Sequence, residues 1–323
     1  MNILITRHDK IGDFILTLPM IKIAKEQIKG SRIIVLVSKI NYDLAKSLNF
    51  IDDVILYDNS ILTLTTKIKE NNIDVSISAF TDTTLAIALF LAAVKKRYAP
   101  ATKIAQLFSN HRVVQRRSKV EMREFEYNIA LLQNFKSNIK ADFNKPLLSF
   151  NQNEKDSELV QFKEQFNITE DFEYIALHPG FGGSSDGNLT IDDYIKLAKS
   201  ISLKKNIKVV FTFGPDDHES KEYIKENIDF DAILYDSHLS LINFCKLISN
   251  FKIFISTSTG PMHLAGAVNI QTISFFGISL FASAKRWGSI NEIKFQNNYS
   301  IPLGYDRDLY NTIENKLDEL TND

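Results

Sequence analysis

The chain has 323 residues, of which 44% are hydrophobic and 24% are charged, a balance typical of a globular protein with about two domains. The longest apolar run, Leu85–Val94, is too short to cross a bilayer, and charged residues at 7–10 interrupt any signal-peptide core. The single cysteine, Cys245, excludes an intrachain disulfide framework and argues against a thiolate metal site. We therefore expect a cytoplasmic protein.

The net charge of −1 hides two halves of opposite sign. Residues 1–150 hold 22 Lys and Arg against 14 Asp and Glu, whereas residues 151–323 hold 16 against 25. Nine basic residues and one acid lie within Lys95–Arg123. A charged run is usually a solvated face, but an asymmetry of this size favours an anionic partner for the first half.

In chain order, the first half alternates strands with helices. Its expected strands are Ile3–Thr6, Arg32–Val37, Val54–Tyr57 and Val75–Ser78. Its expected helices are Phe14–Ile28, Thr84–Val94 and Glu121–Phe135. This βαβ alternation predicts a parallel sheet with helices on both faces.

A polar linker, Asn144–Asn153, separates this half from a second one with the same pattern. The expected helices there are Glu154–Gln165, Ile191–Leu203, Glu219–Asn227, Leu241–Asn250, Met262–Val268 and Asp308–Leu320. The expected strands are Tyr174–Leu177, Lys208–Phe213, Ala232–Leu234, Ile253–Ser256 and Gln271–Phe275. The predicted class is α/β, with Rossmann-like domains at 1–150 and 151–323 whose parallel sheets face a central cleft. The last helix closes the second domain or packs back on the first.

Two loops of the second half suit a bound anion. Only two of the 12 glycines precede residue 180, and close backbone approach to a ligand favours glycine. One loop, 178–188, is rich in Gly and Ser. The other follows the strand at 253–256, where the sequence Ser-Thr-Ser-Thr-Gly-Pro leads into a helix with His263 in its first turn.

Both loops leave the carboxyl ends of predicted parallel strands, so they emerge at one edge of the sheet. Hydroxyls, backbone N–H groups and a helix N-terminus together favour a diphosphate over an ordinary capped turn. The candidate donor-binding residues are Gly182, Gly183, Ser184, Ser185, Ser258, Thr259, Gly260 and His263. Glu219 opens a helix and either caps it or accepts a hydrogen bond from a ribose hydroxyl.

Competing motifs in this half are weaker. Gly183–Gly187 matches the G-x-S-x-G pattern of serine hydrolases, with Ser185 as nucleophile, but several residues separate it from the strand. No G-x-x-x-x-G-K-[ST] or G-x-G-x-x-G occurs, which disfavours a P-loop kinase or a standard dinucleotide enzyme. Asp306 and Asp308 fit helix capping better than metal binding, and no cluster has metal-ligand spacing.

In the first half, the sequence Lys10-Ile11-Gly12-Asp13 follows the first strand. Gly12 would allow the loop to pass close to a ligand. Asp13 either caps the next helix or, at the mouth of a cleft, acts as a general base. The residue pattern alone slightly favours the cap.

These segments together resemble glycosyltransferase family 9, the ADP-heptose:lipopolysaccharide heptosyltransferases, over nearly the whole chain. The resemblance rests on Ile11-Gly12-Asp13, the His178-Pro-Gly loop, Phe213-Gly214 followed by Glu219, and Ser258-Thr-Gly-Pro-Met-His263. It implies the GT-B fold, an inverting mechanism without metal or cofactor, an N-terminal acceptor domain and a C-terminal nucleotide-sugar domain. It also implies that Asp13 is the catalytic base, and that Thr259, Gly260 and His263 contact the diphosphate.

The chain departs from the family at two positions. Heptosyltransferases commonly have a donor-binding lysine where this chain has Gly187–Thr190, and often an aspartate in place of Ser258. Ser184 and Ser185 could replace part of the phosphate contact. The sugar and nucleotide of the donor are therefore less determined than the family.

The resulting expectation is an enzyme that transfers heptose from ADP-heptose to a lipopolysaccharide or lipooligosaccharide core. Its anionic acceptor and the inner surface of the inner membrane are expected to meet the basic first half. The candidate acceptor-binding residues are Arg7, Lys10, Gly12, Arg116 and Arg117. We expect no nucleic-acid partner. The alternatives are a serine hydrolase that uses Ser185 and another GT-B nucleotide-sugar enzyme, such as an epimerase.

Overall fold

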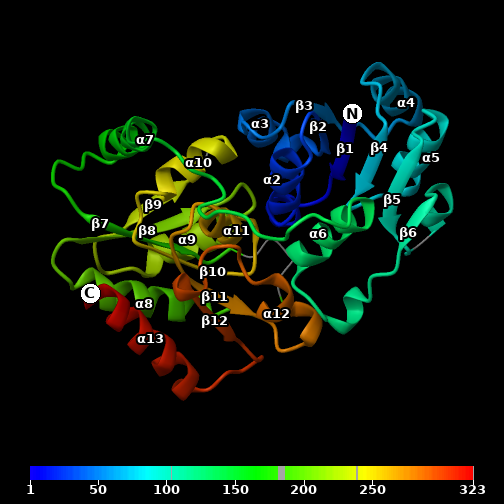
Figure 1. Ribbon diagram of the computed structural model, residues 1–323. Coiled ribbons are helices and arrows are strands. Elements are labelled where there is room, and N and C mark those ends of the chain that lie inside the picture. Colours follow the sequence, from blue (N-terminus) through cyan, green and yellow to red (C-terminus); the bar gives the residue numbers. More distant parts are fainter. Residues whose placement is uncertain (103, 181–185, 238, 323) are drawn as a thin grey trace. The chain divides into compact units, whose positions relative to one another are not determined.

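The computed structural model describes residues 1–102, 104–180, 186–237 and 239–322. The chain forms two compact units, Met1–Asn144 and Lys145–Asp323. The division between them falls at the start of the polar segment that the sequence predicts as a linker. Figure 1 shows both units, coloured along the chain.

The first unit is built on a six-stranded parallel sheet. Its strand order is β3-β2-β1-β4-β5-β6, so the chain starts in the middle, moves to one edge and then crosses back. The first point of reversal therefore lies between β1 and β4. The strands are β1 (Asn2–Arg7), β2 (Arg32–Val37), β3 (Asp53–Leu56), β4 (Val75–Ser78), β5 (Lys96–Pro100) and β6 (His111–Val113).

Helices cover both faces of this sheet. Leucines and isoleucines of α4 and α5 pack against the apolar side chains of β1 and β2 on one face, while α2 and α6 pack against each other and against the sheet on the other. The helices are α1 (Ile11–Ile15), α2 (Leu18–Gln27), α3 (Lys39–Ser47), α4 (Ile61–Glu70), α5 (Thr83–Leu91) and α6 (Glu124–Phe135), with 3₁₀ turns η1 (Ile104–Phe108) and η2 (Arg117–Lys119).

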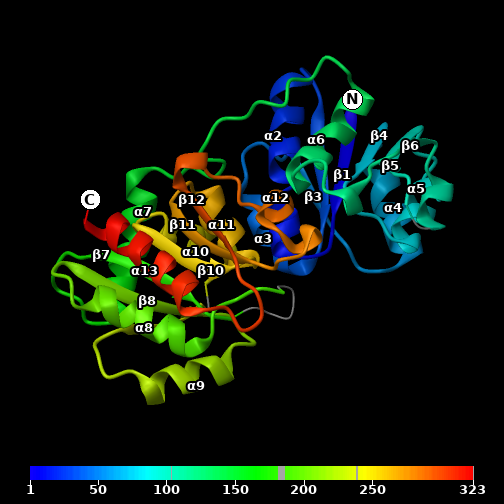
Figure 2. The same cartoon turned by 90° about the horizontal axis from the view of Figure 1, so that it is seen from below.

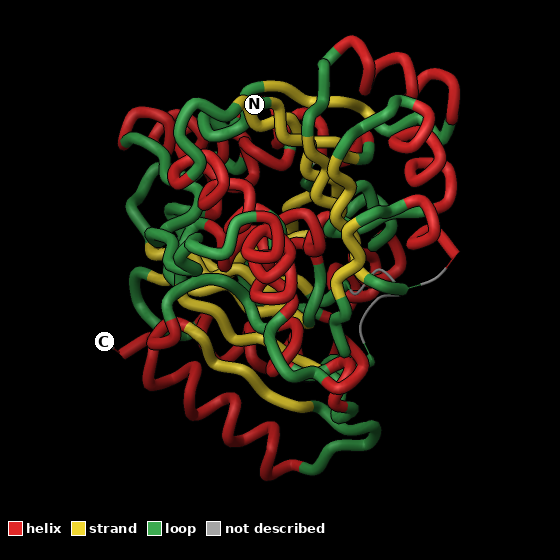
Figure 3. The backbone as a smooth tube through the Cα atoms, turned by 45° about the vertical axis from the view of Figure 1, so that its right-hand side comes forward, coloured by secondary structure: helices red, strands yellow, loops and turns green. Residues whose placement is uncertain are grey.

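The second unit repeats this topology. Its parallel sheet has the order β12-β11-β10-β7-β8-β9, which is the same winding with the reversal between β7 and β10. The strands are β7 (Glu173–His178), β8 (Ile207–Phe213), β9 (Ile233–Asp236), β10 (Ile253–Thr257), β11 (Gln271–Phe276) and β12 (Gln296–Ser300). Figure 3 shows these strands as a curved yellow layer between helices.

Two groups of helices enclose the second sheet. On one face lie α8 (Ile191–Ser202), α9 (His218–Asn227) and α13 (Arg307–Asn322), and on the other lie α7 (Gln152–Gln165), α10 (Leu241–Ile248) and α11 (Gly260–Ala267), as Figure 2 shows. A buried apolar cluster joins α8 and α13 to β7, β8, β10 and β11. The short elements η3 (Leu280–Ala282), α12 (Ala284–Trp287) and η4 (Ile293–Phe295) precede β12.

The sequence-based elements lack helices α3, α4 and α12 and strands β5, β6 and β12, which the structure contains. The predicted helix Phe14–Ile28 is two helices, because the chain breaks at Leu16 and Thr17, just before Pro19. Strand β12 reads Gln-Asn-Asn-Tyr-Ser and carries no apolar alternation, so it was not predicted. It lies at the edge of the sheet, where a strand has a neighbouring strand on one side only, and none of its residues is fully buried.

The search for a membrane-spanning helix, made on the described residues alone, finds no helix with the length and apolarity to cross a bilayer.

Candidate active site

Asp13 lies at the carboxyl edge of the first sheet, beside its point of reversal. β1 ends at Arg7, and α1 begins at Ile11, so Asp13 occupies the first turn of a helix that follows the central strand. Its side chain keeps 15% of its surface exposed. Ligands of open parallel sheets bind at this kind of edge, so Asp13 is well placed to meet one.

Arg7 is the charged partner of Asp13. Its side chain is only 5% exposed, and its guanidinium forms an ion pair with Asp13 through Nη2. Nε of the same guanidinium lies 2.8 Å from Oδ1 of Asp9, and Nη1 lies 3.6 Å from Oε1 of Glu124. One buried cation is thus shared by three carboxylates.

The backbone around Asp13 is also held. Thr17 Oγ1 donates to the carbonyl of Asp13 at 2.9 Å, and Asn128 Nδ2 on α6 donates to Thr17 Oγ1 and to the carbonyl of Leu16. These bonds explain the break between α1 and α2, since buried side chains satisfy the polar groups that a continuous helix would satisfy itself.

Burial raises the pKa of Asp13 to about 6, against the opposing effect of Arg7. The negative charges of Asp9 and Glu124 add to the increase. A carboxylate with a pKa in this range is ionised at neutral pH and is a stronger base than an exposed aspartate. The site can therefore accept a proton from a bound hydroxyl.

The other candidates for acceptor binding differ in exposure. Lys10 and Arg116 are exposed, and Gly12 is buried in α1. Arg117 is 17% exposed, and its guanidinium pairs with Glu124 and lies within hydrogen-bond distance of Asn128 Oδ1. Direct acceptor contacts by Arg7 and Arg117 stay predictions, because the structure shows both engaged with carboxylates of the protein.

Sequence reasoning missed Glu124, which is 1% exposed on α6 and joins Arg7 to Arg117. A signal for it was present in the sequence, since Glu124 is three residues before Tyr127 and so lies on the same face of the helix as buried residues of α6. Such a residue is seldom fully buried unless it is paired.

In the second unit, the two anion-suited loops follow β7 and β10, which are neighbours on either side of the point of reversal. His178 pairs in register with Ser256, so both loops leave the same edge. This confirms the expectation that they converge, and it places Ser258, Thr259 and Gly260 where doubly wound sheets bind ligands.

The two loops are joined at their base. Thr257 Oγ1 lies 2.5 Å from the carbonyl oxygen of Gly187, to which it donates, and 3.2 Å from that of Phe275. Asn188 Nδ2 donates to the carbonyl of Pro179 at 3.0 Å and so closes the first loop. A Cβ on Gly187 would lie 2.2 Å from the carbonyl oxygen of Phe276, so only glycine fits there.

His178 fixes the loop rather than facing a ligand. Its Nδ1 lies 3.0 Å from Thr212 Oγ1, and its Nε2 lies 3.7 Å from Asp217 Oδ2. Burial lowers the pKa of this imidazole. Asp217 also accepts from the N–H of Gly214 at 2.7 Å and lies against Gly180, where a Cβ would be 2.1 Å from its Oδ1.

His263 is buried in the first turn of α11, with 3% of its surface exposed. Burial lowers its pKa to about 3, so the ring is neutral at physiological pH. Its Nδ1 has no hydrogen-bond partner among the described residues. The N-cap of α11, Thr259, makes no side-chain capping bond, and Gly260 and Pro261 open the helix. The edge therefore offers backbone N–H groups and a helix dipole without a fixed positive charge.

The remaining candidates for donor binding are less defined by the structure. Glu219 is exposed in the first turn of α9, and Ser258 is partly exposed. Gly182, Gly183, Ser184 and Ser185 lie outside the described residues. Within the described residues, no group of three or more His, Cys, Asp or Glu has a metal-binding arrangement.

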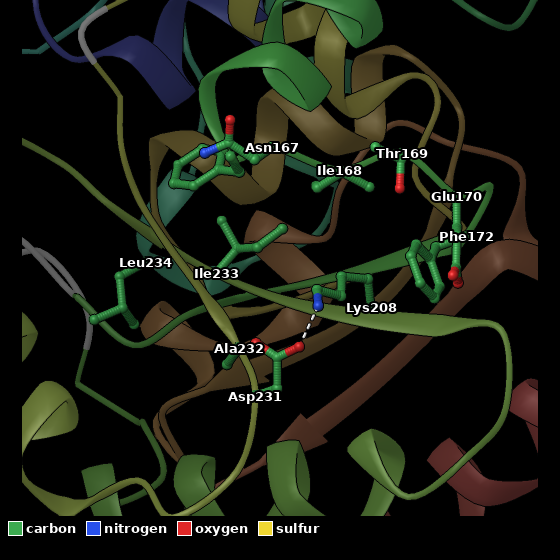
Figure 4. A pocket seen from close by; sticks show the side chains of 11 residues that line it. Asn167, Ile168, Thr169, Glu170, Phe172, Lys208, Asp231, Ala232, Ile233 and Leu234 are labelled. Atoms are coloured by element: carbon green, nitrogen blue, oxygen red, sulfur yellow. Dashed lines mark hydrogen bonds and ion pairs between the residues drawn. The ribbon is translucent and has the colours of Figure 1, made fainter.

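A cavity of about 470 Å³ opens at the other edge of the second sheet (Figure 4). It lies where β7, β8 and β9 begin, and the ion pair between Lys208 and Asp231 crosses it. Because ligands of such sheets bind outside the carboxyl ends of the strands, this cavity is not the candidate site.

Comparisons with known proteins bear on the family and the fold. The model of glycosyltransferase family 9 (heptosyltransferase) matches residues 61–302. A Haemophilus influenzae protein assigned as a glycosyltransferase is 32% identical over 99% of this chain and 96% of its own length. Lipooligosaccharide heptosyltransferase 2 of Campylobacter jejuni is 22% identical over 90% of this chain and 85% of its own.

The solved structure of Escherichia coli ADP-heptose lipopolysaccharide heptosyltransferase II has the same fold. It superimposes with a TM-score of 0.80 at 19% identity and covers 99% of this chain and 98% of its own. The fold class is GT-B, as the resemblance implied, with two Rossmann-like units; the central cleft between them stays a prediction. The chain is a glycosyltransferase and belongs to glycosyltransferase family 9, the heptosyltransferase family.

Proposed function

We propose that the protein catalyses the inverting transfer of a heptose from ADP-heptose to a lipopolysaccharide or lipooligosaccharide core. The observation that carries this proposal is Asp13, a carboxylate at the ligand-binding edge of the first unit with a pKa raised to about 6. The names of two relatives, a lipooligosaccharide heptosyltransferase and an ADP-heptose lipopolysaccharide heptosyltransferase, support the choice of donor and acceptor.

The reaction is a single displacement. Asp13 takes the proton of an acceptor hydroxyl while that oxygen attacks the anomeric carbon, and the bond from this carbon to the diphosphate oxygen breaks. The negative charge that develops on the diphosphate lies against the N-terminus of α11, at Thr259, Gly260 and His263. Preorganised dipoles stabilise such charge without reorganisation, so we propose a reaction without a metal or cofactor.

His263 supports the diphosphate assignment. A buried polar atom normally has a hydrogen-bond partner, and Nδ1 of His263 has none within the described residues. Nδ1 is itself buried, so a phosphate oxygen would accept a hydrogen bond from the neutral ring after the side chain turns toward the edge. The loss of the family lysine near Gly187 and the change to Ser258 leave this edge with fewer charged groups, so backbone N–H groups carry more of the binding.

The first unit would receive the acceptor. Lys10 and Arg116 are exposed cations that suit an anionic core, and the segment 83–120 contains no Asp or Glu. In the same segment, Ile104 and Leu107 are 70% and 65% exposed. Exposed apolar side chains beside cations suit an anionic membrane surface, so we propose a cytoplasmic protein in peripheral contact with the inner membrane.

Family membership favours transfer over the two alternatives. An epimerase of the same fold would act on the donor without an acceptor, and a hydrolase would depend on Ser185, which lies outside the described residues. The raised pKa of Asp13 suits a base that takes a proton from an acceptor hydroxyl, which is the step that transfer requires.

The test is Asp13→Asn, assayed for heptosyl transfer to core oligosaccharide and for binding of ADP-heptose. We expect transfer to fall by roughly a thousandfold, since general-base catalysis contributes about 10²–10⁴, while donor affinity stays within about twofold. The matched control, Asp43→Asn, changes an exposed carboxylate of α3 and should be silent. Full activity of Asp13→Asn would remove Asp13 as the base, and a preference for UDP or GDP sugars would overturn the donor assignment.

A further inference from the structure

Glu124 is the buried carboxylate that the proposed reaction leaves without a role. It lies on α6, is 1% exposed, and contacts Arg7 on one side and Arg117 on the other. Burying a carboxylate costs desolvation free energy unless it is paired. Here both of its partners also contact other groups: Arg7 contacts Asp9 and Asp13, and Arg117 contacts Gln115. The cost suggests that its charge serves the site rather than the fold alone.

The charges of this cluster explain what Glu124 can do. Two guanidiniums, of Arg7 and Arg117, face three carboxylates, of Asp9, Asp13 and Glu124. Within the described residues, these five paired groups sum to a charge of −1 when Asp13 is ionised and to zero when Asp13 is protonated; the exposed Lys10 lies outside this sum. In a buried site, the neutral state is strongly preferred, so the excess negative charge makes Asp13 take up a proton.

We propose that Glu124 is a positioning residue that tunes the base: by sharing the Arg7 guanidinium with Asp13, it keeps Asp13 able to accept a proton from the acceptor. The proposal rests on the proposed role of Asp13. Arg7 alone would pair with Asp13 and make it a weak base. Glu124 at 3.6 Å and Asp9 at 2.8 Å from the guanidinium divide its charge.

The fold holds this arrangement rigidly. Gln115 Oε1 accepts from Nε and Nη2 of Arg117 at 3.1 and 2.9 Å, which aims that guanidinium at Glu124. Asn128, one turn along α6 from Glu124, binds the carbonyl of Leu16 at 3.0 Å and so fastens α6 to the segment after Asp13. The nearby Lys10 is exposed, and solvent weakens its opposing effect on Asp13.

The test replaces Glu124 with Gln, which keeps the shape and removes the charge. The cluster is then neutral with Asp13 ionised, so the pKa of Asp13 falls. We expect the acid limb of the pH profile of kcat/KM to move down by about one pH unit, and the plateau of kcat to fall roughly tenfold because the base is weaker. Glu124→Asp retains the charge and should restore the position of the acid limb.

The matched control is Glu126→Gln on the same helix. Glu126 is exposed, and its carboxylate accepts from the N–H of Arg123 at 2.7 Å, a bond that glutamine also makes. Its pH profile should coincide with that of the unmodified protein. A Glu124→Gln variant whose rate falls while its acid limb stays in place would overturn the proposal, because that result describes a merely structural residue.

A second measurement separates this proposal from the role of Asp13 in transfer. The carboxyl carbon of Asp13 can be titrated by NMR in the substrate-free protein, with Asp13→Asn to assign the signal. A lower pKa in Glu124→Gln supports the tuning even if Asp13→Asn proves active, in which case only the proposed function fails. An unchanged or higher pKa refutes the tuning, whatever the activity.

Discussion

The carboxyl edges of the two sheets share a topology but not a chemistry. The edge of the first unit is built from buried charges: Arg7 is shared by Asp9, Asp13 and Glu124. The edge of the second unit is built from small residues, backbone N–H groups and a neutral imidazole, His263. The acidic half of the chain thus carries the proposed anion site, and the basic half carries the proposed base.

The difference follows from what each edge is proposed to do. The strength of a base depends on its pKa, which neighbouring charges shift. Such charges act more strongly when they are buried, because less water screens them. A leaving diphosphate needs dipoles aimed at the position where its negative charge develops. The net charge of a domain therefore does not predict the charge of the groups at its sheet edge.

The largest effect on stability is expected from Arg7→Met. It removes the cation that Asp9 and Asp13 share and one of the two arginines that pair with Glu124, and breaking a buried pair costs about 3–5 kcal/mol. Urea unfolding followed by circular dichroism should show this loss. Arg32→Met removes a partly exposed pair with Asp53 and should cost no more than about 1 kcal/mol. Equal losses of stability in the two variants would mean that the ion pairs of Arg7 contribute no more to folding than a surface ion pair.

A smaller loss is expected from Gly187→Ala in the second unit. Its Cβ would lie 2.2 Å from a backbone oxygen of Phe276, so strands and loop must shift, at a cost of about 2–3 kcal/mol. Donor affinity, measured by calorimetry, should fall with it. Gly214→Ala has a single neighbour at 3.3 Å, Oδ2 of Asp217, and should be tolerated. A fully stable Gly187→Ala would show that backbone approach does not shape this edge.

A still smaller effect is expected on membrane binding by the surface of the first unit, the basic half of the chain. Ile104→Asn with Leu107→Asn should weaken binding to phosphatidylglycerol vesicles several-fold, since each buried apolar side chain contributes to insertion. Phosphatidylcholine vesicles should bind weakly throughout. Leu62→Asn removes a side chain on α4 that is 80% exposed and has no basic neighbours in its helical turn. Identical binding of the two variants would contradict a membrane face at η1.

We expect no effect of pH on donor affinity between pH 5.5 and 8. Burial lowers the pKa of His263 to about 3, so the ring is neutral and uncharged over this whole range. The affinity for ADP-heptose should therefore be constant, whereas transfer should fall below pH 6 as Asp13 gains a proton. Tighter donor binding at low pH would show that His263 is a cation in the complex.

Most of the elements and the family were predictable from the sequence, whereas helices α3, α4 and α12 and strands β5, β6 and β12 were not. Apolar runs such as Arg32–Val37 and Val75–Ser78 become strands with those bounds, because local burial and β-branched composition suffice to define them. The loop with Ser258, Thr259 and Gly260 was found because glycine, hydroxyls and a helix start are local signals. Polar edge strands such as β12 carry no such signal.

Which side chains meet depends on the tertiary structure. Strand order places β7 beside β10, and so brings two loops far apart in the chain to one edge. Packing also places Glu124 of α6 beside Arg7 of β1, so Arg7 and Arg117 are both paired with carboxylates, and their contacts with an acceptor stay predictions. Charge type is written in the sequence, but burial and shared partners depend on packing, and these set the pKa of Asp13.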